Sequence, residues 1–276
     1  MSDIDAALDA LQTGTVSMRL ARTESDIDAA QALRYRVFYE EMQAKASQEA
    51  ARLRRDVDPF DEVCDHLLVT DHSMGAGAES VIATYRLLRG TVADSYGRFY
   101  TASEYDIRNL YGLPGEMLEL GRSCVDARSR NRPTMQLLWR GIATYVFHHN
   151  ISVMFGCASL QGTDPKSLAI PLSYLHHFHL APPGLRTKAL PNLYVDMNFC
   201  SPEKLDKRRA LASLPPLIKG YLRLGGFVGD GAVVDEQFNT TDVCIIVKTD
   251  LVTDKYYRHY IRTASEAGTV DEIEHD

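Results

Sequence analysis

The sequence of 276 residues lacks the marks of several large protein classes. No segment approaches the roughly 20 consecutive apolar residues that a membrane-spanning helix needs. The first residues, MSDIDAALDALQTG, are acidic and contain no basic segment followed by an apolar one, so they are unlike a secretory signal. These absences predict a protein that stays in the cytoplasm.

Cysteine is scarce and several short catalytic motifs are missing. The five cysteines are widely spaced without a Cys-x-x-Cys pair, and the nine histidines contain no HExxH pattern, so we expect neither a disulfide framework nor a bound metal. The phosphate loop GxxxxGK[ST], the dinucleotide motif GxGxxG and the serine elbow GxSxG are absent. We therefore expect no tightly bound cofactor, and no nucleotide hydrolase, Rossmann dehydrogenase or serine hydrolase.

Positive charge is in deficit, because the formal net charge is −7, and this argues against a nucleic-acid partner. The basic residues that are present gather in three groups. Each group is either a solvated surface or a docking point for an anionic partner. The groups are Arg52, Arg54 and Arg55; Arg128, Arg130 and Arg132; and Lys204, Lys207, Arg208 and Arg209.

Hydrophobic periodicity predicts an α/β (α+β) protein. A helix begins near Ser25 or Asp26, and residues 66–90 form a hairpin of two strands. Residues 117–125 form a strand, 134–150 a helix whose first turn includes Pro133, and 151–160 a buried strand. A last helix over 214–226 precedes two strands. We expect a flexible leader over 1–16, one domain over 17–262 with an insertion at about 161–210, and a disordered acidic tail over 263–276.

The β-loop-α-β unit at residues 117–160 is a natural anion site. Free backbone N–H groups and the helix dipole point at the loop that precedes the helix. This loop carries Arg128, Arg130 and Arg132, so it fits a ligand that bears a phosphate.

Carboxylates and one tyrosine are the candidates for chemistry. Glu119 lies within an apolar strand, where a carboxylate is costly unless it is paired. It is either a base or anchor for a cationic amine, or it forms a buried ion pair with Arg122, or it lies at an exposed edge. Strict alternation places Arg122 on the opposite face unless a bulge intervenes. Tyr221 is either a core aromatic residue or a general acid.

The order of these elements, together with Tyr221 before Gly225, Gly226 and Phe227, resembles the GNAT acyltransferase fold, whose mixed, twisted central sheet is flanked by helices. One set of spacings is similar to the acyl-homoserine-lactone synthases, although the chain's only tryptophan, Trp139, does not follow the Arg–Phe element. That set is Arg34 with Phe38, Asp58 with Asp61, Arg86, and Glu119 with Arg122.

Longer blocks resemble the bacterial ornithine–acyl carrier protein N-acyltransferases of ornithine-lipid synthesis. They include RYRVFYEEM, DPFDEVCDHLLV, LELGRSCV, LLWRGIATY, MFGCASLQGTDP and LPPLIKGYLRLGGFVGDGAVVDEQFNTTDV. This resemblance implies transfer of a (3-hydroxy)fatty acyl group from the phosphopantetheine of acyl carrier protein to the α-amine of ornithine, with possible transient contact with the inner membrane. The alternatives are another amino acid such as glutamine, a lactone synthase, or a regulatory domain that binds a carrier protein.

The resemblance also implies roles for individual residues. Glu119 is the base, Arg122 holds it, backbone N–H groups from Ser123 to Val125 polarise the thioester, and Tyr221 is the candidate acid. Asp58 and Asp61 bind the second amine of the acceptor, and Arg86 binds its carboxylate. The residues assigned to the donor are Arg34, Phe38, Val125, Arg128, Arg130 and Arg132.

Overall fold

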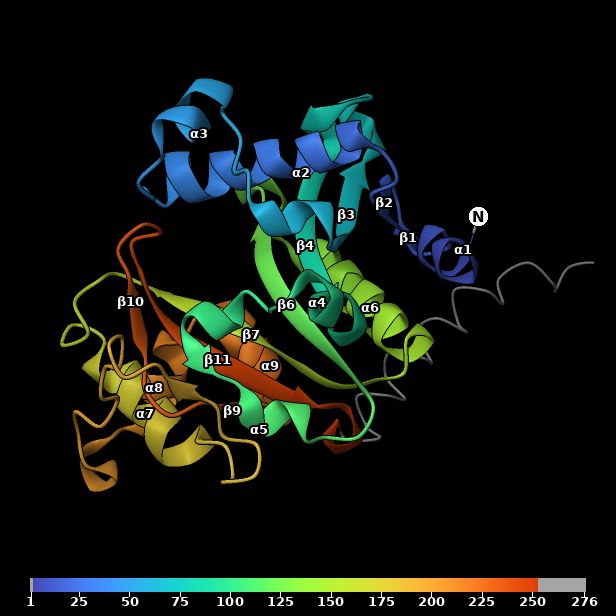
Figure 1. Ribbon diagram of the computed structural model, residues 1–276. Coiled ribbons are helices and arrows are strands. Elements are labelled where there is room, and N and C mark those ends of the chain that lie inside the picture. The colour runs from blue at the N-terminus through green and yellow to red at the C-terminus, as the bar shows by residue number, and fades with distance from the viewer. Residues whose placement is uncertain (1, 253–276) are drawn as a thin grey trace, which may run out of the picture.

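A mixed β-sheet of nine strands runs through residues 2–252, the part of the chain that the computed structural model describes (Figure 1). The main path is β1-β2-β3-β4-β6-β7-β11-β10, and β9 also pairs with β11. Every pair is antiparallel except β6 with β7. The strands are β1 (Gln12–Thr13), β2 (Val16–Leu20), β3 (Asp65–Asp71), β4 (Val81–Arg89), β6 (Glu116–Val125), β7 (Ile151–Gln161), β9 (Phe227–Val228), β10 (Val233–Asp235) and β11 (Thr240–Lys248).

Helices flank this sheet, which confirms the mixed sheet with flanking helices predicted from the sequence. A separate pair of short strands is formed by β5 (Tyr105–Asp106) and β8 (Lys188–Ala189). None of the helices within residues 2–252 is both long and apolar enough to cross a bilayer. The helices are α1 (Asp3–Asp9), α2 (Glu24–Tyr35), α3 (Gln48–Leu53), α4 (Gly90–Tyr96), α5 (Arg108–Tyr111), α6 (Arg132–His148), α7 (Ala169–His179), α8 (Lys207–Ser213) and α9 (Pro216–Arg223).

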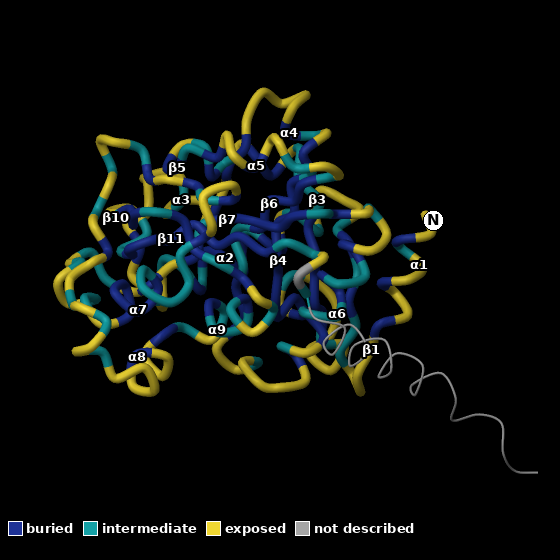
Figure 2. The backbone as a smooth tube through the Cα atoms, turned by 90° about the horizontal axis from the view of Figure 1, so that it is seen from below, coloured by how far each residue is buried: buried dark blue, intermediate teal, exposed yellow. Residues whose placement is uncertain are grey.

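Strand alternation divides the core between the two faces of the sheet. In β3, Leu67 and Val69 join the cluster that α1, α6 and α9 cover, whereas Leu68 packs with α2 on the other face. In β4, Leu87 and Leu88 divide in the same way, and Leu88 packs toward α4 and the segment that follows it. Figure 2 shows the resulting layers, with buried strands between helices whose outer sides are exposed.

Local capping explains how α2 begins and corrects the predicted start. The cap is Thr23, whose side chain accepts the N–H of Asp26, while the Asp26 carboxylate accepts the N–H of Thr23. Ser25 and Asp26 therefore lie inside the first turn. The predicted helix continues beyond Tyr35 as a wide π-turn, Arg36–Glu41, which carries Phe38 toward the sheet.

The two ends and the long connection differ from expectation in different ways. Within the predicted flexible leader, α1 is capped and buries Ile4 and Leu8 in the main core, so a loose leader is wrong for residues 3–9. The predicted insertion at 161–210 contains α7 and α8, and Leu172 and Leu175 pack into the same core rather than into a second lobe. The predicted tail at 263–276 lies outside the described residues.

Candidate active site

A split between the two central strands forms the candidate site. The parallel strands β6 and β7 stay paired from Glu116 and Ile151 to Glu119 and Phe155, and beyond this point their residues line a cavity of about 540 Å³. Gly156 follows the last pair. A Cβ atom there would lie 2.2 Å from the carbonyl oxygen of Leu120, so only glycine allows the two backbones to approach so closely before they diverge.

The cavity collects side chains from several parts of the fold that lie far apart in the sequence. Its walls come from the π-turn, β4, the segment after α4, β6, β7 and the β10–β11 hairpin, and Pro215–Leu217 closes one side. Among the predicted site residues, the cavity is lined by Phe38, Arg86, Glu119, Arg122, Ser123, Val125 and Arg130.

Glu119 is held at this cavity by backbone N–H groups. It is 5% exposed, and its two carboxylate oxygens accept the N–H of Tyr100 at 3.0 Å and the N–H of Thr101 at 2.6 Å. Burial raises the pKa of Glu119, although these hydrogen bonds oppose the shift. The partners of Glu119 are thus the backbone of Tyr100 and Thr101 together with the Thr101 side chain, and not Arg122, which leaves a fixed, buried carboxylate at the cavity wall.

Arg122 reaches the same cavity through a bulge. Its φ of 50° lies in the left-handed region, and the register between β4 and β6 shifts between Thr84 and Arg86. A side chain in this conformation costs on the order of 1–3 kcal/mol, a strain that is common near active sites. The Arg122 guanidinium lies 5.0 Å from the Tyr100 ring and donates to Asp58 at 2.8 Å. Asp58, rather than Glu119, therefore holds the Arg122 guanidinium in position.

Arg122 is one member of a buried network of three arginines and three aspartates. Burial raises the pKa of Asp61, but the hydrogen bond and charge of Arg34 outweigh this and lower the pKa to about 2. The ion pairs join Arg34 to Asp56 (2.8 Å) and Asp61 (2.6 Å), Arg86 to Asp58 (2.9 Å) and Asp61 (3.3 Å), and Arg122 to Asp58 (2.8 Å) and Asp56 (3.3 Å).

This network corrects three predicted roles. Arg34 has no exposed surface and does not line the cavity, so it is placed to hold aspartates and not the donor. Asp58 and Asp61 also lie outside the lining, with their oxygens bound to arginines, so they are placed to hold arginines and not an acceptor in the cavity. They instead position Arg86 and Arg122, whose guanidinium groups do face it.

Tyr221 lies behind the cavity wall. It is 3% exposed, packs edge-on against Trp139, and its hydroxyl is hydrogen-bonded to that of Tyr85. Burial raises its pKa well above the usual range, so the phenol keeps its proton. Tyr85 lines the cavity and Tyr221 does not, so an acid role for Tyr221 requires passage of the proton through Tyr85.

The three arginines of the basic loop differ in their positions. Arg130 lines the cavity and forms an ion pair with Glu41, with a 2.7 Å contact from Nη2. Arg128 is exposed and pairs with Asp126 at 2.9 Å. Arg132 is exposed at the first position of α6, whose N-cap is Asn131. Of these three arginines, Arg130 is therefore the one that both lines the cavity and lies beside the N-terminus of α6.

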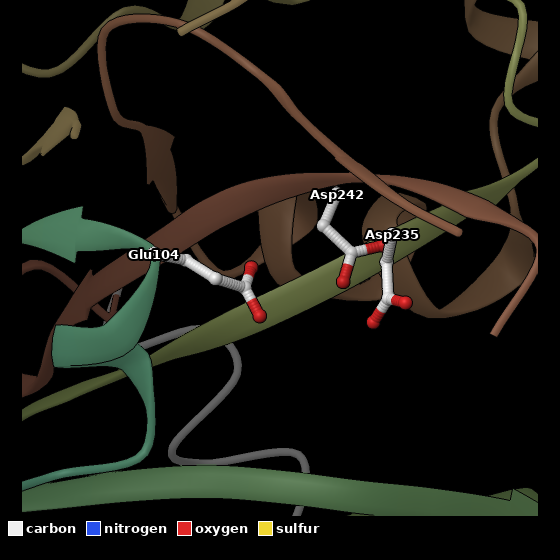
Figure 3. Close-up of side chains that lie close together, drawn as sticks. All are labelled: Glu104, Asp235 and Asp242. Atoms are coloured by element: carbon white, nitrogen blue, oxygen red, sulfur yellow. The ribbon is translucent and has the colours of Figure 1, made fainter. Parts of the chain in front are cut away.

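A second group of carboxylates at the cavity was missed by the sequence analysis. Glu104, Asp235 and Asp242 each offer an oxygen atom within 4.8 Å of the others (Figure 3). Asp242 lies in the apolar strand β11, so, like Glu119, it is a carboxylate that is costly in an apolar strand unless it is paired. Nothing in the sequence around Glu104 indicates that it would join the other two.

Comparison with known proteins identifies the family. The model of the acetyltransferase (GNAT) domain matches residues 33–140. The L-ornithine N(alpha)-acyltransferase of Rhizobium meliloti is 49% identical over 88% of this chain and 83% of that protein, and the enzyme of the same name from Agrobacterium fabrum is 48% identical over 90% and 85%. Among solved structures, FeeM, an N-acyl amino acid synthase from uncultured soil microbes, covers 86% of this chain and 93% of its own at 13% identity and a TM-score of 0.45. Because relatives almost half identical match most of both sequences, the chain belongs to the family of L-ornithine N(alpha)-acyltransferases.

Proposed function

We propose that this chain transfers a 3-hydroxyacyl group from acyl carrier protein to the α-amine of L-ornithine and so forms a lyso-ornithine lipid. The names of its relatives support the acceptor and the reaction. The observation that carries the proposal is the buried Glu119 carboxylate, fixed by two backbone N–H groups at a cavity that opens between β6 and β7.

Glu119 serves as the general base in this proposal. The α-amine of an amino acid is mostly protonated near pH 7 and must lose a proton before it attacks. Glu119, directly or through a water molecule, accepts that proton, and its raised pKa makes it a stronger base than an exposed glutamate. The amine nitrogen then bonds to the thioester carbonyl carbon and gives up a second proton, the carbon–sulfur bond breaks, and the phosphopantetheine sulfur takes up that proton and leaves as a thiol.

Two features support a place for the thioester beside Glu119. Beyond Glu119, β6 is no longer paired with β7, and residues Ser123–Val125 line the cavity, where backbone N–H groups can polarise the carbonyl oxygen. Arg86 and Arg122 present guanidinium groups that can receive the acceptor's carboxylate. A proton from Tyr221 would reach the leaving sulfur through the hydroxyl of Tyr85, which lines the cavity.

The donor's phosphate fits the basic loop. Arg130 lies in the cavity wall, and the exposed Arg128 and Arg132 lie beside the N-terminus of α6, so they suit both a phosphate and the acidic surface of a carrier protein. Because the product carries a fatty chain, we also propose brief contact with the inner face of the membrane during its release.

The test is a mass-spectrometric assay of acyl transfer. The protein receives 3-hydroxyacyl carrier protein together with a pool of amino acids and S-adenosylmethionine. We expect N-acyl-ornithine as the product. An N-acyl-glutamine or N-acyl-glycine product would refute ornithine and retain the mechanism, whereas a homoserine lactone would refute the amide-forming reaction. No product from folded protein would favour a regulatory domain that only binds the carrier.

A further inference from the structure

The carboxylates of Glu104, Asp235 and Asp242 converge from three separate segments (Figure 3). Glu104 precedes β5, Asp235 ends β10, and Asp242 lies in β11, so the β10–β11 hairpin carries two of them. Asp235 and Asp242 line the same cavity as Glu119. Glu104 lies just behind, 7% exposed, and accepts a hydrogen bond from the thiol of Cys157 at 3.3 Å.

This acidic triad differs from the aspartates of the neighbouring ion-pair network in its charge balance. In the network three arginines match three aspartates. Within residues 2–252, no lysine or arginine forms an ion pair with Glu104, Asp235 or Asp242. Three carboxyl groups thus meet at a cavity with no lysine or arginine paired to them, an arrangement that is costly in the charged form unless a ligand supplies the positive charge.

A buried oxygen without a partner points in the same direction. Asp242 is 6% exposed, and its Oδ1 atom has no hydrogen-bond donor in the described part of the chain. Buried carboxylate oxygens in folded proteins are nearly always bonded to a donor. Asp235 is different, because its Oδ1 atom accepts the N–H groups of Gln237 and Phe238 at 2.8 and 2.9 Å. The hydroxyls of Thr240 and Ser159 also adjoin the Asp242 carboxylate, but neither makes a hydrogen bond of good geometry with Oδ1, so this oxygen is available to a donor that enters the cavity.

The pKa shifts of two members of the triad are those expected of buried carboxyl groups whose charged form a cation would stabilise. Burial and the charge of Asp242 raise the pKa of Glu104 to about 8. Burial also raises the pKa of Asp242 to about 6, with Asp235 adding repulsion. A bound cation would favour the charged form of each group and lower both pKa values.

We propose that Glu104, Asp235 and Asp242 bind the side-chain ammonium of the acceptor amino acid and so select a diamino acid. This inference rests on the proposed function and assigns a residue set to the second amine of its acceptor. An ammonium donates three hydrogen bonds, and three carboxylates from three segments can each accept one.

The position of the triad relative to Glu119 suits an acceptor with two amines. Thr101 donates its N–H to Glu119, and its hydroxyl lies 3.9 Å from the Cys157 sulfur, which in turn donates to Glu104. Thr101 and Cys157, which contact each other in space, thus lie between Glu119 and the triad along one wall of the cavity. An acceptor spanning that wall places its α-amine at Glu119 and its second amine at the triad, whereas a neutral side chain leaves the triad without a cation.

The test compares ornithine with norvaline, which has the same chain length and no terminal amine. The variants are Asp242→Asn and Glu104→Gln, each of which replaces an ionisable carboxyl group by a neutral amide of the same shape. We expect the KM for ornithine to rise roughly tenfold or more in each variant, since a charged hydrogen bond is lost. The KM for norvaline and for the acyl carrier protein should stay within about twofold. The wild type should prefer ornithine strongly, and the variants should lose most of that preference.

Controls separate this inference from the proposed function. Glu203→Gln makes the same chemical change at an exposed position and should alter neither KM. Thermal melting checks that each variant is folded. The melting temperature should not fall, because each substitution removes one of three carboxyl groups that repel one another. An unchanged ratio of ornithine to norvaline in both variants overturns the inference while the proposed function stands. A wild type that makes no N-acyl-ornithine overturns both. Activity that chelation removes and Mg²⁺ or Ca²⁺ restores in the wild type, but not in Asp242→Asn, would make the triad a metal site and refute ammonium binding.

Discussion

Replacement of Glu119 by glutamine removes the proposed base and keeps its shape. Each carboxylate oxygen of Glu119 accepts one backbone N–H group, at 3.0 and 2.6 Å. A glutamine amide has one acceptor oxygen, so one N–H then faces an NH₂ group, at a cost of about 1–3 kcal/mol. Removal of a buried charge offsets part of this cost. Loss of a general base lowers kcat about 10²- to 10⁴-fold, so the expected catalytic defect far exceeds the change in stability.

The assay is kcat for N-acyl-ornithine formation from pH 6 to pH 9.5, together with thermal melting. The defect of Glu119→Gln should shrink as pH rises, because more of the amine is already free of its proton. Glu116→Gln is the matched control, since Glu116 lies on the same strand, accepts the N–H groups of Thr91 and Met117, and does not line the cavity. Activity near that of the wild type in a folded Glu119→Gln variant would refute the base assignment. A defect that stays constant with pH would show that Glu119 positions the substrate instead.

Three further predictions follow from burial and charge. Arg34→Met should lower the free energy of unfolding by about 3–5 kcal/mol in urea titrations, because it leaves two buried aspartates short of a partner, and a loss below 1 kcal/mol would contradict the network. In the folded protein, the pKa of Glu104 is raised from 4.5 to about 8. The groups that face Glu104 are Asp242, Asp235, Cys157 and Arg122. Because the folded state holds this proton more tightly than the unfolded state, the protein without substrate should lose stability as pH rises from 4.5 to about 8. Ornithine should therefore raise the melting temperature more at pH 8 than at pH 6, with norvaline as the control, and an equal effect at both values would argue against the acidic triad as its site. Arg130→Ala should raise the KM for acyl carrier protein several-fold at low salt and leave the KM for ornithine unchanged. An unaltered KM for acyl carrier protein would refute the placement of Arg130 in the donor site.

The central unit of the fold follows from local sequence patterns. The strand predicted at 117–125 is found at Glu116–Val125, the helix predicted at 134–150 at Arg132–His148, and the strand predicted at 151–160 at Ile151–Gln161. These elements have long apolar periodic runs and clear boundaries, including Pro133 in the first turn of the helix. The position of the cavity at the end of the β6–β7 pairing depends on this unit, and so does the placement of Glu119, Ser123 and Val125.

Residue roles in the network were harder to predict, because they depend on which partners the chain brings together. The helical sequence pattern around Arg34 does not distinguish it from an exposed arginine. The tertiary structure shows that it is fully buried between Asp56 and Asp61. Arg122 departs from strand alternation through a bulge; the adjacent Gly121 is compatible with a bulge but does not fix its position or show that Arg122 itself takes the left-handed conformation. The acidic triad joins Glu104 to Asp235 and Asp242, which lie more than a hundred positions further along the chain, so no local pattern predicts that the three meet.

Charge balance distinguishes the carboxylates that support the site from those that are available to a substrate. Asp58 and Asp61 lie close to the cavity, yet arginines occupy their oxygens, so they fix the geometry of Arg86 and Arg122. Asp242 and Glu119 lie in apolar strands and have no arginine or lysine bound to them in the described chain, and both face the cavity. A diamino acid contributes two ammonium groups, which matches two separate uncompensated carboxylate sites. The Asp242→Asn and Glu119→Gln variants should accordingly fail in different ways, the first in KM for ornithine and the second in kcat.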